Sequence, residues 1–338
     1  MEKNDKILKF KRRVNNLFPG INFSQFRNGH VEEGREVWTR NHYTIPSENL
    51  NLIGSPYYYE QKQVVHFTNI FALNSILQEK AIRLYNLHNL NDPREFTFAS
   101  KIFDLSDSVI KDAKDNLFIF SFCEENILNN SSDEFNMWRL YGKNGKGVAL
   151  VFSVQNSLDE WNDFHLSKVS YGVDQRRKFM QLLRFLNANV NQEPFIDVDF
   201  GKLYAFHKSK MFSIEKEVRL VFDRREMRSG AINRTVTLKN EPIFPIIKSD
   251  LYKIIENKNN IRYLRLPIYF TSNKSNDYEV PLLKIEKIIV GYNYIDEVKS
   301  IKSNLFEICN EQLGYTPEIE QTRIKNLYWD IDTKKLKK

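Results

Sequence analysis

Two glutamates, Glu215 and Glu217, are the first candidates for chemistry in this 338-residue chain. Charged and apolar residues alternate from Glu217 to Leu220, which predicts a half-buried strand whose side chains two positions apart share a face. A carboxylate beside a bond that breaks with build-up of positive charge stabilises the transition state, and a second carboxylate can orient or deprotonate a nucleophile. We therefore predict that Glu217 is catalytic and that Glu215 assists it. The competing interpretation is an exposed strand face whose glutamates pair with lysines.

A second group of polar residues lies within apolar segments. His66 and Thr68 are two positions apart in a β-rich run, so both side chains are expected on one strand face, where they can grip a ligand. The competing interpretation of His66 is a core histidine bound to a backbone carbonyl. Ser121 stands between two phenylalanines, and its hydroxyl needs a partner there, which is either the backbone or a ligand.

Two further residues are candidates for holding a cofactor. Arg94 follows a turn in which Asp92 can cap a helix, and its guanidinium can hold a phosphate or a carboxylate. Tyr141 lies close to Trp138 and Arg139. This mixture of rings and a guanidinium suits either helix packing or contact with an adenine or a diphosphate.

Several familiar sites are not indicated. The stretch Gly142–Gly147 lacks the Gly-Lys-Ser/Thr ending of a phosphate loop and leads into a strand, so we expect a hairpin turn. Cys123 and Cys309 are far apart and are expected to be buried thiols. The chain has no His-Glu-x-x-His motif, no Gly-x-Ser-x-Gly motif and no clustered metal ligands, so we expect no metal site and no serine-esterase chemistry.

Short strands and helices must position these residues. Hydrophobic periodicity and turn signals predict the following elements. They are strand Val64–Phe67, helix Ile70–Leu77, strand Ala81–Leu84, a helix from Pro93 to about Lys114, strand Leu117–Cys123, helix Glu134–Tyr141, strand Gly147–Phe152, helices Gln175–Leu186 and Gly201–Phe212, strands Glu217–Phe222, Tyr263–Phe270 and Ile285–Val290, and helix Asp296–Gln312. Because they do not alternate as regular βαβ units, we predict an α+β fold with a mixed, largely antiparallel sheet flanked by helices.

The chain contains no Pro/Gly/Ser-rich linker, which favours one large domain. We expect a variable N-terminal extension over residues 1–60, which opens with a basic helix at Asp5–Phe18. A single α+β core domain should cover residues 61–315, and a C-terminal tail residues 316–338.

Six short motifs, taken in order, resemble the bacterial family known as domain of unknown function 2971. They are VVHFTNIFALNSILQEKAIRL, NLNDPREF, FIFSF, MWRLYGKNGKGVALVF, EKEVRLVF and KIEKIIVG, and they span roughly residues 60 to 295. The first 60 residues fall outside this resemblance. Membership of such a family names no reaction.

The same layout also resembles that of ADP-ribosyltransferases, because a His-x-Thr lies on a first strand, a serine lies between aromatics on a middle strand, and a Glu-x-Glu comes late. The resemblance implies an ADP-ribosyltransferase-like core with NAD as substrate. Glu217 would be catalytic with Glu215 assisting, and His66, Thr68 and Ser121 would bind NAD. This mechanism requires that His66, Ser121 and Glu217 reach one cleft.

The implied reaction is transfer of ADP-ribose to a nucleic acid or a protein, or NAD hydrolysis if water is the acceptor. Such chemistry fits a toxin or a phage-defence effector. The net charge of +7 favours approach to a polyanion. Basic residues cluster at Lys9–Arg13, Arg176–Lys178, Arg224–Arg228 and Lys334–Lys338, although most such clusters are solvated faces.

Two alternatives stay open. The first is a non-enzymatic module that binds nucleic acid or another partner through its basic clusters. The second is a metal-dependent nuclease in which Asp92, Glu95, Glu215 and Glu217 supply carboxylates. The charged start of the chain has no apolar run of secretory length, and no segment approaches the roughly 18 apolar residues of a membrane span, so we expect a cytoplasmic protein.

Overall fold

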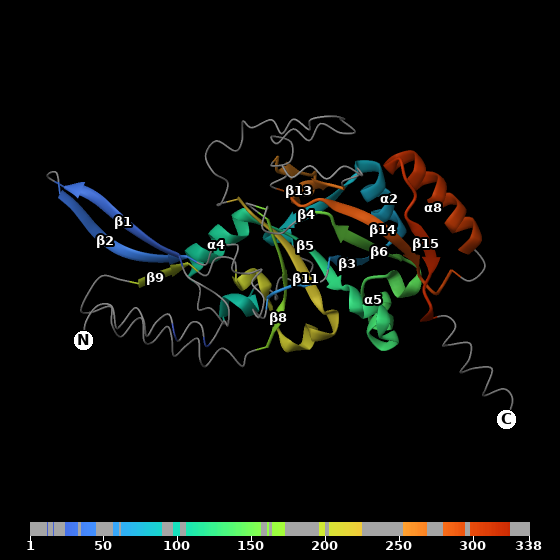
Figure 1. Ribbon diagram of the computed structural model, residues 1–338, viewed down its shortest axis with the longest axis horizontal. Coiled ribbons are helices and arrows are strands. Elements are labelled where there is room, and N and C mark those ends of the chain that lie inside the picture. Colours follow the sequence, from blue (N-terminus) through green and yellow to red (C-terminus); the bar gives the residue numbers. More distant parts are fainter. Residues whose placement is uncertain are drawn as a thin grey trace, which may run out of the picture.

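A computed structural model shows an α+β protein with a mixed, mostly antiparallel sheet flanked by helices (Figure 1), which confirms the predicted fold class. It describes residues 57–60, 62–89, 97–101, 106–156, 161, 164–172, 203–224, 253–268, 280–294 and 298–324, and two isolated positions, 12 and 16. It also describes the backbone of strands β1 (Ser24–Glu32), β2 (Arg35–Thr44) and β9 (Ile196–Asp199), which form a separate sheet.

In the part of the chain that the structure describes, ten strands form the main sheet. In spatial order they are β12 (Ile255–Glu256), β13 (Arg262–Pro267), β4 (Ala81–Asn86), β5 (Leu117–Glu124), β3 (Gln63–Thr68), β6 (Val148–Val154), β14 (Leu283–Val290) and β15 (Glu318–Gln321), with β11 (Glu217–Asp223) pairing with β5 and β7 (Phe164–Lys168) pairing with β11. All these pairs are antiparallel except β14 with β15.

Strand β5 holds the sheet together because it has a partner strand on one edge and two on the other. On one edge, strand β11 pairs with β5 from Leu117 to Cys123. On the opposite edge, β3 pairs with Cys123 and Glu124, whereas β4 pairs with Phe118 and Ile119. Within the described chain, no strand pairs with that edge between these two ladders. Strands β3 and β4 therefore separate beside the middle of β5.

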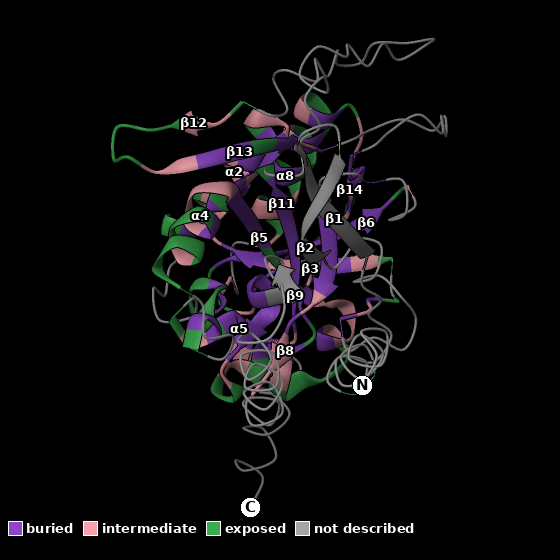
Figure 2. Ribbon diagram, turned by 90° about the vertical axis from the view of Figure 1, so that its left-hand side faces the viewer, coloured by how far each residue is buried: buried purple, intermediate pink, exposed green. Residues whose placement is uncertain are grey.

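Alternation of side chains gives the sheet two apolar faces. One face packs against helices α2 (Ile70–Glu79) and α8 (Val298–Leu313), and we call it the α2–α8 face. The opposite face packs against helix α5 (Ser131–Leu140), and we call it the α5 face. Buried residues run along the strands between these layers (Figure 2).

The predicted helix over Gly201–Phe212 is wrong. That segment forms two 3-10 helices, η6 (Leu203–Phe206) and η7 (Lys210–Glu215), on either side of strand β10 (His207–Lys208). Strand β10 pairs with β8 (Ser170–Tyr171). Residues 207 and 208 thus pair with residues 170 and 171, which are distant in sequence, and helical periodicity cannot reveal such a pairing.

The single helix predicted up to Lys114 is also wrong, because helix α4 (Asp107–Asn116) begins anew at Ser106. Ser106 has an extended backbone, with φ −69° and ψ 157°, and its side chain accepts a hydrogen bond from the amide of Val109. A capping serine with this conformation starts a helix and cannot lie inside one. Residues 97–101 form a separate helical segment.

The remaining elements lie within a few residues of their predicted bounds, and several segments add to the predictions. Strand β15 joins the main sheet beyond residue 315, and Tyr57 and Tyr59 are buried although both precede residue 61, the expected start of the core. Strands β1 and β2 form a hairpin where the sequence shows no steady period. The predicted helix Gln175–Leu186 and most of Asp5–Phe18 lie outside the described residues.

Both cysteines are buried free thiols, as predicted. In the part of the chain that the structure describes, none of the helices combines the length and apolar character needed to cross a membrane.

Candidate functional site

The separation of β3 from β4 opens a cleft with a volume of about 620 Å³. Its walls are the end of β3, one side of α2 along its length, strand β4 and the middle of β5, and we call it the β3–β4 cleft. The lining side chains are mainly polar and aromatic. Those that matter below are His66, Thr68, Glu79, Arg83 and Tyr85.

His66 is held in a defined protonation state at the wall of this cleft. Its Nδ1 lies 3.0 Å from the carbonyl oxygen of Ser121, and its ring packs 4.5 Å from the ring of Phe120. Burial lowers the pKa of His66 to about 4, although the hydrogen bond to Ser121 acts in the opposite direction. Because a carbonyl oxygen can only accept, Nδ1 carries the proton, and the neutral ring keeps Nε2 as an acceptor. His66 therefore bonds to a backbone carbonyl, as one interpretation of the sequence expected, and also lines a cleft that could hold a ligand, as the other expected.

Thr68 also lines the cleft, and the glycine-rich turn packs closely against its backbone. Strand β6 begins opposite Thr68, and a Cβ on Gly147 would lie 2.2 Å from the carbonyl oxygen of Thr68. Only glycine allows this close approach. The turn itself, η4 (Lys143–Gly145), joins helix α5 to strand β6, so the predicted hairpin is wrong although a tight turn is present.

A guanidinium and a carboxylate share the far wall of the cleft. Arg83 Nε donates to Glu79 Oε2 at 2.9 Å, and Arg83 Nη2 also contacts the other carboxylate oxygen. Their side chains remain 32% and 21% exposed, so both can meet a ligand. A guanidinium with this fork geometry can also hold a phosphate in a bidentate manner.

Glu215 and Glu217 lie in a separate group, which we call the ion cluster, with Lys208 and Arg219. Lys208 Nζ lies 2.7 Å from Glu215 Oε2 and 2.8 Å from Glu217 Oε2. Arg219 Nε donates to Glu217 Oε1 at 2.7 Å. The four residues are only 3–5% exposed. Two carboxylates and two cations balance each other, which is the condition for burying charge without a large penalty.

Other residues complete the hydrogen bonds of the ion cluster. The hydroxyl of Tyr141 donates to Glu215 Oε1 at 2.6 Å, and Arg219 Nη1 donates to the carbonyl oxygen of Ala205 at 2.6 Å. The amide of Glu217 donates to the hydroxyl of Tyr171 at 2.7 Å. Both oxygens of each carboxylate therefore have a partner.

The prediction that Glu215 and Glu217 project from one face of the same strand is wrong. Glu215 ends the 3-10 helix η7, Lys216 has a left-handed backbone with φ 43°, and Glu217 begins β11. The two glutamates do not share a strand. They converge because both reach Lys208 Nζ, and they are buried, which also overturns the alternative of an exposed strand face.

Burial raises the pKa of Glu217, but the charges and hydrogen bonds of Arg219 and Lys208 outweigh it and lower the pKa to about 2. The carboxylate is ionised at any ordinary pH. A carboxylate so firmly paired is a poor proton acceptor.

Acid should reveal this pairing. Because the pKa of Glu217 falls from 4.5 to about 2 on folding, its contribution to stability is full above pH 4.5 and is lost as the pH falls toward about 2. The difference in free energy of unfolding between wild type and Glu217→Gln should therefore shrink by about 2 kcal/mol between about pH 5 and about pH 3. Urea titrations at several pH values measure it, and a constant difference would contradict the assignment.

Strand registers show which predicted residues meet. Val65, Cys123 and Glu217 are opposite one another on β3, β5 and β11, so they share the α5 face. His66, the next residue on β3, points to the α2–α8 face. The requirement that His66 and Glu217 reach one cleft is therefore not met, and the mechanism that joins them is wrong.

The remaining predicted residues divide as follows. His66 and Thr68 line the β3–β4 cleft together. Ser121 borders it with its carbonyl, but its side chain lies on the α5 face and is exposed, so burial does not demand a ligand there. Tyr141 belongs to the ion cluster, and Arg94 lies outside the described residues.

Four residues of the ion cluster and the β3–β4 cleft were not predicted from the sequence. Arg219 follows Glu217 by two positions in the alternating strand, and that spacing alone indicates an ion pair. Arg83 and Glu79 are similarly close in sequence, but a helix end separates them from the start of a strand. Lys208 carries no local signal, because only the pairing of β10 with β8 brings it to the glutamates.

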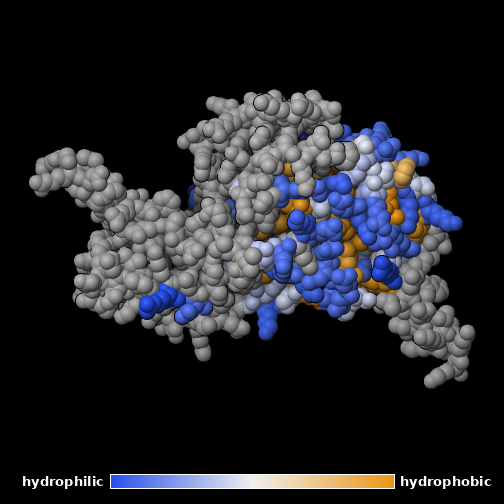
Figure 3. Space-filling model, in the orientation of Figure 1, coloured by the Kyte–Doolittle hydropathy of each residue, from blue (hydrophilic) through white to orange (hydrophobic). Residues whose placement is uncertain are grey.

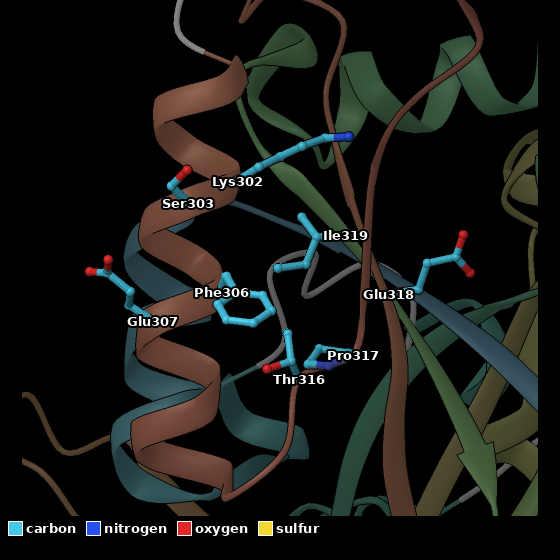
Figure 4. Close-up of a pocket in the computed structure, with 8 residues that line it drawn as sticks. All are labelled: Lys302, Ser303, Phe306, Glu307, Thr316, Pro317, Glu318 and Ile319. Atoms are coloured by element: carbon cyan, nitrogen blue, oxygen red, sulfur yellow. The ribbon is translucent and has the colours of Figure 1, made fainter.

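A second hollow, with a volume of about 630 Å³, lies between α8 and β15 (Figure 4). Phe306 and Ile319 face each other across it, whereas Glu307 and Glu318 point away. It offers an apolar contact but no set of polar groups converging on a ligand, unlike the β3–β4 cleft. Among the residues coloured in Figure 3, apolar ones are exposed in narrow bands between hydrophilic ones.

The described residues contain no group of three His, Cys, Asp or Glu side chains that could hold a metal ion. Of the carboxylates proposed for a nuclease, Glu215 and Glu217 are occupied by Lys208 and Arg219, and Asp92 and Glu95 lie outside the described residues. The basic clusters of the sequence also lie almost entirely outside them.

The model of a family described as protein of unknown function (DUF2971) matches residues 137–220. The matched segment contains the end of α5, the η4 turn and the whole ion cluster, whereas His66 and Thr68 precede it. No curated protein matches the chain, and no solved structure matches it.

Proposed function

We propose that the β3–β4 cleft binds NAD and that the protein breaks the nicotinamide–ribose bond, passing ADP-ribose to a macromolecular acceptor or to water. The observation that carries the proposal is the meeting of neutral His66, Thr68 and Arg83 in one cleft between separated strands. A dinucleotide needs hydrogen-bond partners for sugar hydroxyls, a cation for its diphosphate and apolar surfaces for its rings.

Each need has a candidate residue. His66 Nε2 can accept a hydrogen bond from a ribose hydroxyl, since Nδ1 is already engaged. The hydroxyl of Thr68 can bind the same sugar or the carboxamide. Arg83 can hold the diphosphate. Phe120 and Tyr85 offer ring surfaces on which a planar base can stack.

The reaction needs a carboxylate, and Glu79 replaces Glu217 in this role because it is the carboxylate among the lining residues. In the reaction the C1′–nitrogen bond breaks and nicotinamide leaves with the electron pair. The nucleophile then bonds to C1′ and its proton passes to a base. A diphosphate that competes for Arg83 frees an oxygen of Glu79 to stabilise the positive charge on the sugar.

Calorimetric titration with NAD and chromatographic measurement of nicotinamide release test the proposal. His66→Ala should weaken NAD binding about tenfold, and Thr68→Val should do so several-fold, because each removes a hydrogen bond to the ligand. Glu79→Gln should retain binding and lose nicotinamide release.

Matched controls are available on the same fold. His88→Ala removes an exposed histidine whose partner is Asp115, and Thr316→Val alters a threonine in the α8–β15 hollow; neither should change binding. Absence of NAD binding by the wild type at millimolar concentration would refute the proposal. Binding without turnover in both wild type and Glu79→Gln would leave a nucleotide-binding protein and refute the transfer step.

A further inference from the structure

Strands β4 and β13 place two arginines directly opposite each other beside the β3–β4 cleft. Arg83 of β4, which lines the cleft, is the register partner of Arg265 of β13. Residues opposed in this way project from one face of the sheet with their Cβ atoms about 5 Å apart. Arg265 is exposed and Arg83 is half-buried. Like charges in this position destabilise a sheet, so an anion that joins both guanidinium groups would relieve the repulsion.

The protein neutralises only part of this charge. Glu79 pairs with Arg83, whereas Arg265 has no ion-pair partner among the residues that the structure describes. The nearby Arg262, by contrast, pairs with Asp115. Two guanidinium groups on β4 and β13 therefore share one carboxylate, and one positive charge remains beside the cleft.

Two tyrosine rings lie next to the arginines. The guanidinium carbon of Arg83 lies 4.8 Å from the centroid of the Tyr263 ring, and Tyr263 is only 6% exposed. A guanidinium stacked on a fixed ring keeps its in-plane N–H groups available to an oxyanion. Tyr85 is the register partner of Tyr263, with the two ring centroids 6.0 Å apart, and it lines the cleft with 36% of its surface exposed. Its ring is a surface on which a base can stack.

We propose that Arg265 acts together with Arg83 and Tyr85 to bind the ADP half of a dinucleotide, with the diphosphate between the two guanidinium groups and the adenine on the Tyr85 ring. The diphosphate of a dinucleotide carries one negative charge on each phosphate, which matches two forked guanidinium groups. A macromolecule is disfavoured because a cleft of about 620 Å³ has the size of a small-molecule site.

This subsite also gives the ligand a direction along the cleft. The direction rests on the proposed function: with ADP on β4 and β13, the nicotinamide riboside would lie toward His66 and Thr68 on β3. ADP and ADP-ribose keep the half that the subsite holds, so both should compete with NAD. Binding of ADP needs no turnover and is tested separately.

Calorimetric titration with ADP, adenosine and inorganic pyrophosphate, in the absence of NAD, tests the subsite. Wild type should bind ADP more tightly than either fragment, because each fragment lacks one of the two contacts. Arg265→Ala should weaken ADP binding about tenfold and leave adenosine binding unchanged, since it removes a charge-assisted hydrogen bond to phosphate. Tyr85→Ala should weaken the binding of both ADP and adenosine about fivefold.

Thermal unfolding separates this role from a structural one. Without ligand, Arg265→Ala should unfold at or above the wild-type temperature, because the repulsion with Arg83 is gone. With ADP, its unfolding temperature should rise less than that of wild type. Arg265→Lys keeps the charge but loses the fork, so it should recover only part of the ADP affinity.

Arg139→Ala is the matched control, because it alters an exposed arginine that lies over an aromatic ring, Phe135, on helix α5; it should bind ADP like wild type. Absence of ADP binding by wild type at millimolar concentration overturns the proposal, and so does unchanged ADP affinity in Arg265→Ala. NAD binding that ADP does not displace would overturn it and leave the proposed function intact. ADP binding without nicotinamide release from NAD would support the subsite and refute the transfer reaction.

Discussion

Replacement of Glu217 by glutamine is expected to lower the free energy of unfolding by about 3–5 kcal/mol. Glutamine has nearly the same shape but no charge, so Lys208 and Arg219 would remain buried with one carboxylate, Glu215, between them. Cations removed from water without their counter-charge are strongly destabilising. Urea titration followed by circular dichroism measures the change.

Glu318→Gln is the matched control for this substitution. Glu318 is 61% exposed and pairs with Lys287 at the surface, so its loss should alter the free energy of unfolding by less than about 1 kcal/mol. If Glu217→Gln unfolds like wild type but releases no nicotinamide, Glu217 is the catalytic carboxylate, and its assignment to a structural role is wrong.

Trp138→Ala should be similarly destabilising, by about 3–5 kcal/mol. Trp138 is fully buried on the α5 face, with its ring 5.0 Å from that of Phe67 in an edge-on arrangement. Its Nε1 donates to Glu134 Oε1 at 2.9 Å, and Glu134 is itself buried and also bound by Thr322. The substitution leaves a cavity and removes a hydrogen bond from a buried carboxylate. Thermal and urea unfolding both measure the loss.

Phe306→Ala serves as the control for Trp138→Ala because Phe306 is 55% exposed, so truncation should cost less than about 1 kcal/mol. The outcome also decides between the two uses that the sequence left open for Trp138. A variant with normal stability that fails to bind NAD would place the indole on the ligand. A destabilised variant that binds NAD normally when folded would confirm helix packing.

Short-range pattern was sufficient for most of the scaffold. Continuous apolar runs located strand β5, alternation located β11, and helical spacing located α2, because these signals depend on which face of an element meets the core. The absence of regular βαβ units was enough to indicate a mixed, mostly antiparallel sheet. The pairing of His66 with Thr68 on one strand face followed from a spacing of two residues, and both line one cleft.

The burial and pairing of Glu215 and Glu217 depended on the tertiary structure. By sequence, Glu215 and Glu217 looked like two carboxylates on one accessible strand face, and a left-handed Lys216 between them removed that geometry. Lys208 reaches them only because β10 pairs with β8, and Arg219 lies on the same face of β11 as Glu217. A buried balance of four charges depends on which segments come together, and spacing along one segment cannot show that.

The sequence by itself therefore determined most of the elements of the main sheet, the fold class and the placement of His66 and Thr68 on one strand face, since all three follow from side-chain periodicity within single segments. Only the tertiary structure decided that β3 and β4 part beside β5 and form a cleft, and that Glu79 and Arg83 complete it. It also placed Glu217 on the opposite face. The physical reason is that a cleft and a buried ion cluster arise from register and burial between distant strands, which no local pattern encodes.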